Sequence, residues 1–75
     1  MAEDKKEIIY KLMKQFPDDK LSVKQIYDFL KENMSYPTVL KWVVVLQAER
    51  RLLIEDYGSL KLVYLNKEFE EDAKR

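Results

Sequence analysis

The segment "SYPTVLKWVVVLQAERRLLI", residues 35–54, carries most of the information about the fold. Pro is well tolerated in a first helical turn, where its missing N–H would have no partner. The residue before a Pro avoids the helical conformation, so we expect a helix to begin near Pro37, with Ser35 and Tyr36 at its boundary. In residues 39–46, seven of the eight residues are apolar. Such a helix must bury much of its surface or present an apolar side to a partner.

A helical projection at about 100° per residue divides this helix into two sides. We expect the inward side to join the core through Val39, Trp42, Val43, Leu46 and the aliphatic stem of Arg50. The outward side mixes aliphatic residues with one basic residue early and one late. It comprises Pro37, Leu40, Lys41, Val44, Ala48 and Arg51, with Val45 at its edge. The function of the chain therefore depends on what this outward side meets.

Two amphipathic helices are expected before this segment. In "DKKEIIYKLMKQF", apolar residues recur at helical spacing, which predicts a helix over residues 4–15 that Pro17 ends. In "LSVKQIYDFLKEN", Leu21 is predicted to be an extended residue of a small sheet. Ser22 and Gln25 then form a capping-box pattern, which satisfies two otherwise unpaired amides and starts a second helix.

A β-hairpin is expected after the segment. "LLIEDYGSLKLVYLN", residues 52–66, holds two runs of strand-forming residues around Gly58, the only glycine of the chain, which supplies the positive φ of a tight turn. Residues 67–75 are expected to form a polar tail, for which a helix is one option. The prediction is thus an α+β fold, mainly α, in one domain spanning residues 1–75, with its core in about residues 4–66.

Composition limits the chemistry. The 75 residues hold 14 basic and 14 acidic side chains, with no Cys and no His. Catalytic residues, metal ligands and cofactors are therefore not expected, and an enzyme is improbable. No segment has the roughly 18 consecutive apolar residues that would span a membrane, and we expect a cytoplasmic protein. Residues 35–51 carry three bases against one acid, a local charge of +3 − 1 = +2.

The order of these elements resembles the winged helix-turn-helix family. "LSVKQIYDFLKEN" is similar to the family's first strand and second helix, and "IEDYGSLKLVYLN" to its wing. The most specific part is the run S-x-x-T-V-x-K-W-V-x-x-L, residues 35–46, followed at once by a short hairpin. The resemblance covers residues 4–66. It implies three helices, a short hairpin wing and a charged C-terminal tail.

The resemblance also implies double-stranded DNA as a partner, with the third helix in the major groove and the wing near the backbone. The chain would then be a transcription regulator. The expected DNA-binding residues are Ser35, Tyr36, Thr38, Leu40, Lys41, Val44 and Arg51 on the helix, and Tyr57, Ser59 and Lys61 on the wing. Unlike many family members, the helix lacks the Arg or Asn that often reads bases there.

A second interpretation stays open. The net charge is zero and the outward side holds Leu40, Val44 and Val45, which suit a protein partner or a homodimer as well as thymine methyl groups. In that case the winged helix is an interaction module with little affinity for DNA. Tyr57, beside the hairpin turn, is open between a contact with DNA or a partner and packing across the strands.

Overall fold

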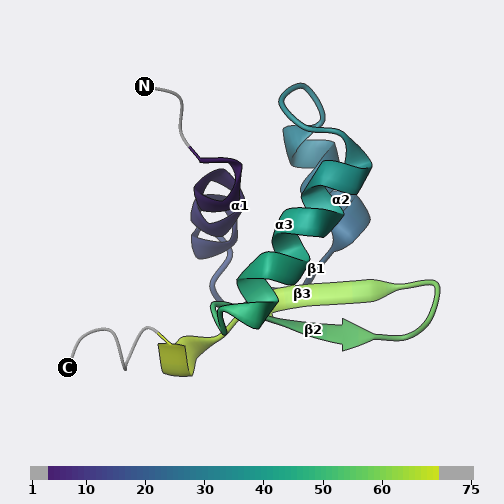
Figure 1. Cartoon of the computed structure of the whole chain (residues 1–75). Helices are drawn as coiled ribbons and strands as arrows, with labels where there is room; N and C mark the ends of the chain where they lie inside the picture. Colours follow the sequence, from purple (N-terminus) through teal and green to yellow (C-terminus); the bar gives the residue numbers. More distant parts are fainter. Residues whose placement is uncertain (1–3, 70–75) are drawn as a thin grey trace.

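The computed structural model describes residues 4–69 and contains three helices and a small antiparallel sheet (Figure 1). The elements follow in the order α1 (Lys5–Lys14), β1 (Leu21–Ser22), α2 (Val23–Leu30), α3 (Tyr36–Ala48), β2 (Leu52–Asp56) and β3 (Lys61–Leu65). In the sheet the strands are ordered β1-β3-β2. This is the arrangement of a winged helix-turn-helix, and the prediction of an α+β, mainly helical fold is confirmed.

Polar caps start all three helices. The Asp4 carboxylate accepts a hydrogen bond from the amide of Lys6 at 2.9 Å, and α1 ends at Lys14 with Gln15 as its C-cap. The predicted capping box is confirmed: the Gln25 amide donates to Ser22 Oγ at 3.0 Å and the Ser22 amide donates to Gln25 Oε1 at 2.8 Å. Ser35 caps α3. These bonds satisfy amides that have no partner inside the helix, so the helix starts follow directly from the sequence.

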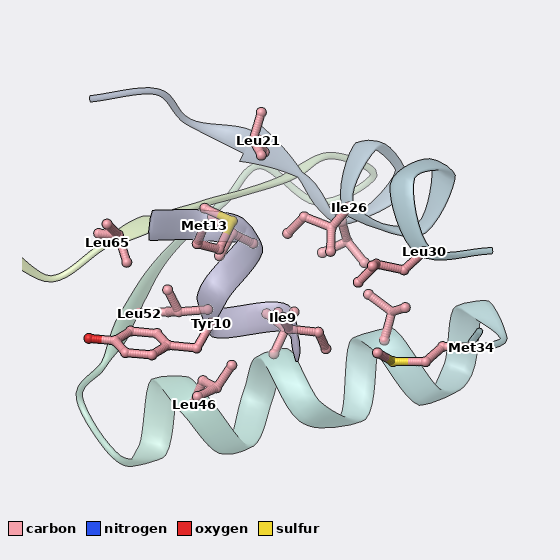
Figure 2. Packing of buried hydrophobic residues seen from close by; sticks show 14 residues of the cluster. Ile9, Tyr10, Met13, Leu21, Ile26, Leu30, Met34, Leu46, Leu52 and Leu65 are labelled. Atoms are coloured by element: carbon pink, nitrogen blue, oxygen red, sulfur yellow. The ribbon is translucent and has the colours of Figure 1, made fainter. Parts of the chain in front are cut away.

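The core lies between the three helices and one face of the sheet (Figure 2). Val39, Val43 and Leu46 of α3 are fully buried in it, as the helical projection predicts. The prediction for Trp42 is wrong in degree, because its ring is only partly buried and packs against the edge of the core. Lys41 Nζ lies 5.0 Å from the centre of that ring.

The end of α3 differs from the prediction. The helix stops at Ala48, and Arg50 adopts a left-handed conformation with φ of 65°. The amides of Arg50 and Arg51 donate to the carbonyls of Gln47 and Leu46, both at 2.9 Å, which is the Schellman pattern of helix termination. This turn carries both arginines off the helical projection. Arg50 is exposed instead of lying in the core, so that prediction is wrong.

The wing is the hairpin of β2 and β3. Its register pairs Leu53 with Tyr64 and Glu55 with Leu62, and β1 joins β3 through Leu21 and Val63. At the tip, the Tyr57 amide donates to the Leu60 carbonyl at 2.8 Å across Gly58 and Ser59. Gly58 has a φ of 81°, the positive value predicted for this turn.

The predicted C-terminal tail is only partly described. Residues 67–69 form one helical turn after β3. For residues 70–75, the expectation of a polar tail with a helix as one option falls outside the described residues.

Candidate nucleic-acid interface

The outward side of α3 is a solvent-facing surface. Val44 is 49% exposed and Tyr36 is 43% exposed, and Lys41 is also exposed. Leu40 is half-buried and packs against the core by one edge. Val45 is half-buried as well, at the margin where the projection places it. The centre of this side is therefore apolar and accessible, with one lysine beside it.

The first turn of α3 is held firmly in place. Ser35 Oγ and Thr38 Oγ1 share a hydrogen bond of 2.9 Å, and the Thr38 amide donates to Ser35 Oγ at 3.4 Å. The ring of Tyr36 stands edge-on to that of Tyr27 of α2, with 5.7 Å between centroids. Ser35 and Thr38 thus serve first as a cap, but they lie at the exposed end of the helix where a DNA backbone can approach.

The tip of the wing is also well ordered by hydrogen bonds. The Gly58 amide donates to Asp56 Oδ1 at 2.8 Å, and Lys61 Nζ donates to the Gly58 carbonyl at 3.3 Å. Tyr57 is 62% exposed, and its hydroxyl donates to Glu55 Oε2 at 2.6 Å. The ring of Tyr57 therefore projects from the tip while its hydroxyl is anchored. This geometry leaves the ring face available to a ligand.

A hollow of about 400 Å³ joins the helix to the wing. It is lined by the start of α2, the start of α3 and the wing tip: Ser22, Val23, Lys24, Tyr36, Ser59, Leu60 and Lys61. Of the wing residues predicted from the sequence, Ser59 and Lys61 lie here. Lys24 and Leu60 were missed. No local signal marks them, because their position depends on how α2 folds against a hairpin more than 30 residues away.

Charge is distributed unevenly around this surface. Within residues 4–69, Lys24 and Lys41 form no ion pair. Lys61 Nζ lies 3.9 Å from Asp56 Oδ1 at the exposed wing. An ammonium group without a nearby carboxylate is free to neutralise a phosphate.

Arg51 does not lie on the outward side of α3, so its predicted placement there is wrong. Its guanidinium pairs with Glu7 at 2.8 Å and with Glu49 at 3.2 Å. It also lies over the rings of Tyr10 and Phe69, at 5.3 and 5.5 Å. Arg51 therefore ties the end of α3 to α1.

Glu55, an acidic residue near the wing tip, is paired with a neighbouring lysine. Lys20 Nζ donates to Glu55 Oε1 at 2.6 Å, and this bond, helped by the hydroxyl of Tyr57, lowers the pKa of the Glu55 carboxyl below its ordinary value. The same bond raises the pKa of Lys20. The pKa of Tyr57 is raised because its hydroxyl donates to a carboxylate. At neutral pH Glu55 is thus ionised but paired.

Other kinds of site were also considered. Among residues 4–69, no group of three or more acidic, His or Cys side chains is placed to hold a metal ion. Within the same range, no helix is long and apolar enough to cross a membrane.

The comparisons with known proteins support the fold. No protein-family model matches the chain, and no curated protein matches its sequence. A solved structure from work on the DNA recognition and protein interaction domains of HOP2, and on its homologous DNA pairing properties, is similar with a TM-score of 0.72. The sequences are 21% identical, and the match covers 80% of this chain and 95% of that chain. At this identity the similarity establishes a shared winged-helix fold.

Proposed function

We propose that this protein binds double-stranded DNA, with α3 in the major groove and the wing against the adjacent backbone. One observation carries the proposal: the hollow places Lys24, Lys61 and Ser59 beside the exposed first turn of α3. Helix and wing thereby form one continuous surface with cationic groups at its border. Such a surface matches a duplex, whose groove admits a helix and whose phosphates flank the groove.

The residues divide by role in this proposal. Lys24, Lys41 and Lys61 neutralise phosphates, and Ser35, Tyr36, Thr38, Tyr57 and Ser59 supply hydroxyl or ring contacts. Leu40 and Val44 face the groove floor. Arg51 has no part, because it is held against α1. The DNA recognition in the description of the HOP2 structure fits the same use of the fold. Regulation of transcription is the biological role we propose for such binding.

The dependence of affinity on salt tests the proposal. Three phosphate contacts predict a slope of log K against log salt of about −2.7, which is roughly a 40-fold loss of affinity between 50 and 200 mM salt. The measurement is fluorescence anisotropy with a labelled duplex of random sequence. Lys24→Gln and Lys41→Gln should each weaken binding and lower the slope by about 1, since each removes one contact.

Lys5→Gln is the matched control. Lys5 is an exposed lysine of α1 outside the proposed surface, so the same substitution there should leave the slope unchanged. Equal effects of all three substitutions would show only a general attraction between charges and would remove the assignment to α3 and the wing. Absence of binding at low salt would overturn the proposal itself.

A protein partner is the second candidate. It is favoured by Val44, which is 49% exposed in the middle of α3, and by the zero net charge. Binding through an apolar surface of Leu40, Val44 and Val45, to another protein or to a second copy, would change little with salt. Sedimentation at several concentrations, with and without a duplex, separates the two candidates. Self-association that ignores DNA would favour this one.

A further inference from the structure

The centre of the outward side of α3 lacks the groups that usually read bases. Val44 is 49% exposed, and its neighbours within about 40° around the helix axis are Pro37, Leu40 and Ala48. Lys41 and Gln47, both exposed, flank these neighbours at about 60° on either side, and the ammonium group of Lys41 rests over the ring of Trp42. The centre of the α3 surface that faces a groove in the proposed function is therefore aliphatic, with no hydrogen-bond donor or acceptor on Val44 itself.

Aliphatic groups meet very different surfaces at the four bases. In the major groove, adenine, guanine and cytosine present donors and acceptors, and thymine alone adds a methyl group. Packing Val44 against a polar edge would strip water from that edge without replacing its hydrogen bonds, which costs free energy. Packing it against a thymine methyl withdraws apolar surface from water on both sides, which is favourable.

We infer that Val44 is a specificity-determining residue that packs against thymine C5 methyl groups, so that the protein prefers duplexes rich in A·T pairs. The inference rests on the proposed function. We assign the exposed apolar strip of α3, formed by Val44 and its aliphatic neighbours, to DNA because the charges beside it also suit DNA. Lys41 on α3 and Lys24 beside the first turn of α3 form no ion pair within residues 4–69. The strip is thereby directed at a groove lined by phosphates.

Replacing thymine by deoxyuracil removes the methyl group alone and tests the inference directly. A short duplex made only of A·T pairs carries a methyl group at every step, so the register of binding need not be known. Its affinity is compared with that of the same duplex containing deoxyuracil. Each methyl group withdrawn from water contributes about fourfold to affinity, so the wild-type protein should bind the deoxyuracil duplex about fourfold more weakly or worse.

Two variants complete the experiment as a cycle. Val44→Ala should bind both duplexes with nearly equal affinity, because it has lost the side chain that senses the methyl group. Leu53→Ala, at a similarly exposed apolar residue of β2, should keep the difference between the duplexes. If Val44→Ala keeps the wild-type difference in affinity between the two duplexes, the methyl effect must come from DNA shape, and the inference is overturned.

The failure of the inference and of the proposed function are distinguishable. Equal, salt-sensitive affinity of the wild type for both duplexes would overturn the role of Val44 and leave DNA binding standing. No affinity for either duplex at low salt would overturn both.

Discussion

Val43 and Val44 are adjacent residues of α3 that differ only in where they point, and the paired substitutions Val43→Ala and Val44→Ala test the placement of the functional surface. Val43 is fully buried and Val44 is 49% exposed. The two substitutions remove the same atoms from the same helix. Any difference in stability therefore reports the surroundings of each side chain.

The expected magnitudes follow from burial. At Val43, two buried methyl groups at about 0.8 kcal/mol each give roughly 1.6 kcal/mol, and the cavity raises the loss to about 2–3 kcal/mol. Ala is a better helix former than Val and returns about 0.5 kcal/mol, which leaves a net loss of about 2 kcal/mol. At Val44, which is half-exposed, the substitution loses only about half of that 1.6 kcal/mol from burial, and no cavity forms. The propensity gain offsets it, so the change in stability should lie within about 0.5 kcal/mol of zero.

Urea denaturation followed by circular dichroism measures both values. With a slope of about 1 kcal/mol per molar for a small domain, the Val43→Ala midpoint should fall about 2 M below that of Val44→Ala. The propensity term is common to both variants and cancels in the comparison. Equal midpoints would show that Val44 is covered to the same degree as Val43, and the outward side of α3 would then be unavailable to any ligand.

Two further predictions concern the wing. The contact of Lys20 with Glu55 lowers the pKa of Glu55 in the folded state. The stabilisation from this contact is therefore present above the ordinary carboxyl pKa and is lost as the pH falls through the lowered value. The Tm of Glu55→Gln should lie below that of the wild type at neutral pH and meet it in acid, and a Tm difference that widens in acid would contradict this. Gly58→Ala should lower stability by about 1 kcal/mol because φ is 81°, although nothing lies within 4 Å of the added methyl group. Gly58→Asn should lose less stability in the same thermal scans. An unchanged Tm for Gly58→Ala would show that the turn relaxes.

Much of the fold was predictable because it depends on local chemistry. The capping box of Ser22 and Gln25 and the Ser35 cap use side chains that bond to amides three residues away. The wing follows from one glycine between two strand-forming runs, and the buried side of α3 follows from helical periodicity. These features need no knowledge of the rest of the chain.

The two arginines were misplaced for a physical reason. A helical projection holds only while the backbone stays helical, and here it stops at Ala48. Arg50 occupies the left-handed position that Gly usually takes in a Schellman motif, so the sequence carried no stop signal. The carbonyl of Arg50 accepts a hydrogen bond at 2.7 Å from Nδ2 of Asn66, the residue after β3, and this bond supports the turn. Such a contact depends on tertiary structure.

The neutral composition is compatible with DNA binding because many charges cancel away from the proposed surface. Lys6 pairs with Glu49 at 2.8 Å, and Lys67 with Asp18 at 2.8 Å. Arg51 and Lys20 form further ion pairs with acidic residues. Together these contacts pair opposite charges on α1, at the end of α3 and on β2. The lysines beside α3 that form no ion pair within residues 4–69, Lys24 and Lys41, act locally, since charges beyond about 10 Å are screened at 0.1 M salt.

The three phosphate contacts of the proposed function are nevertheless few. A protein with roughly six to ten phosphate contacts draws far more of its affinity from electrostatics, so three contacts alone would make only a weak binder at physiological salt. The remaining affinity must come from contacts that salt does not screen. On the exposed surface of α3 those contacts are apolar, and Val44 lies at their centre. The same aliphatic strip that argues for a protein partner is therefore what a DNA-binding chain with so few free lysines would need.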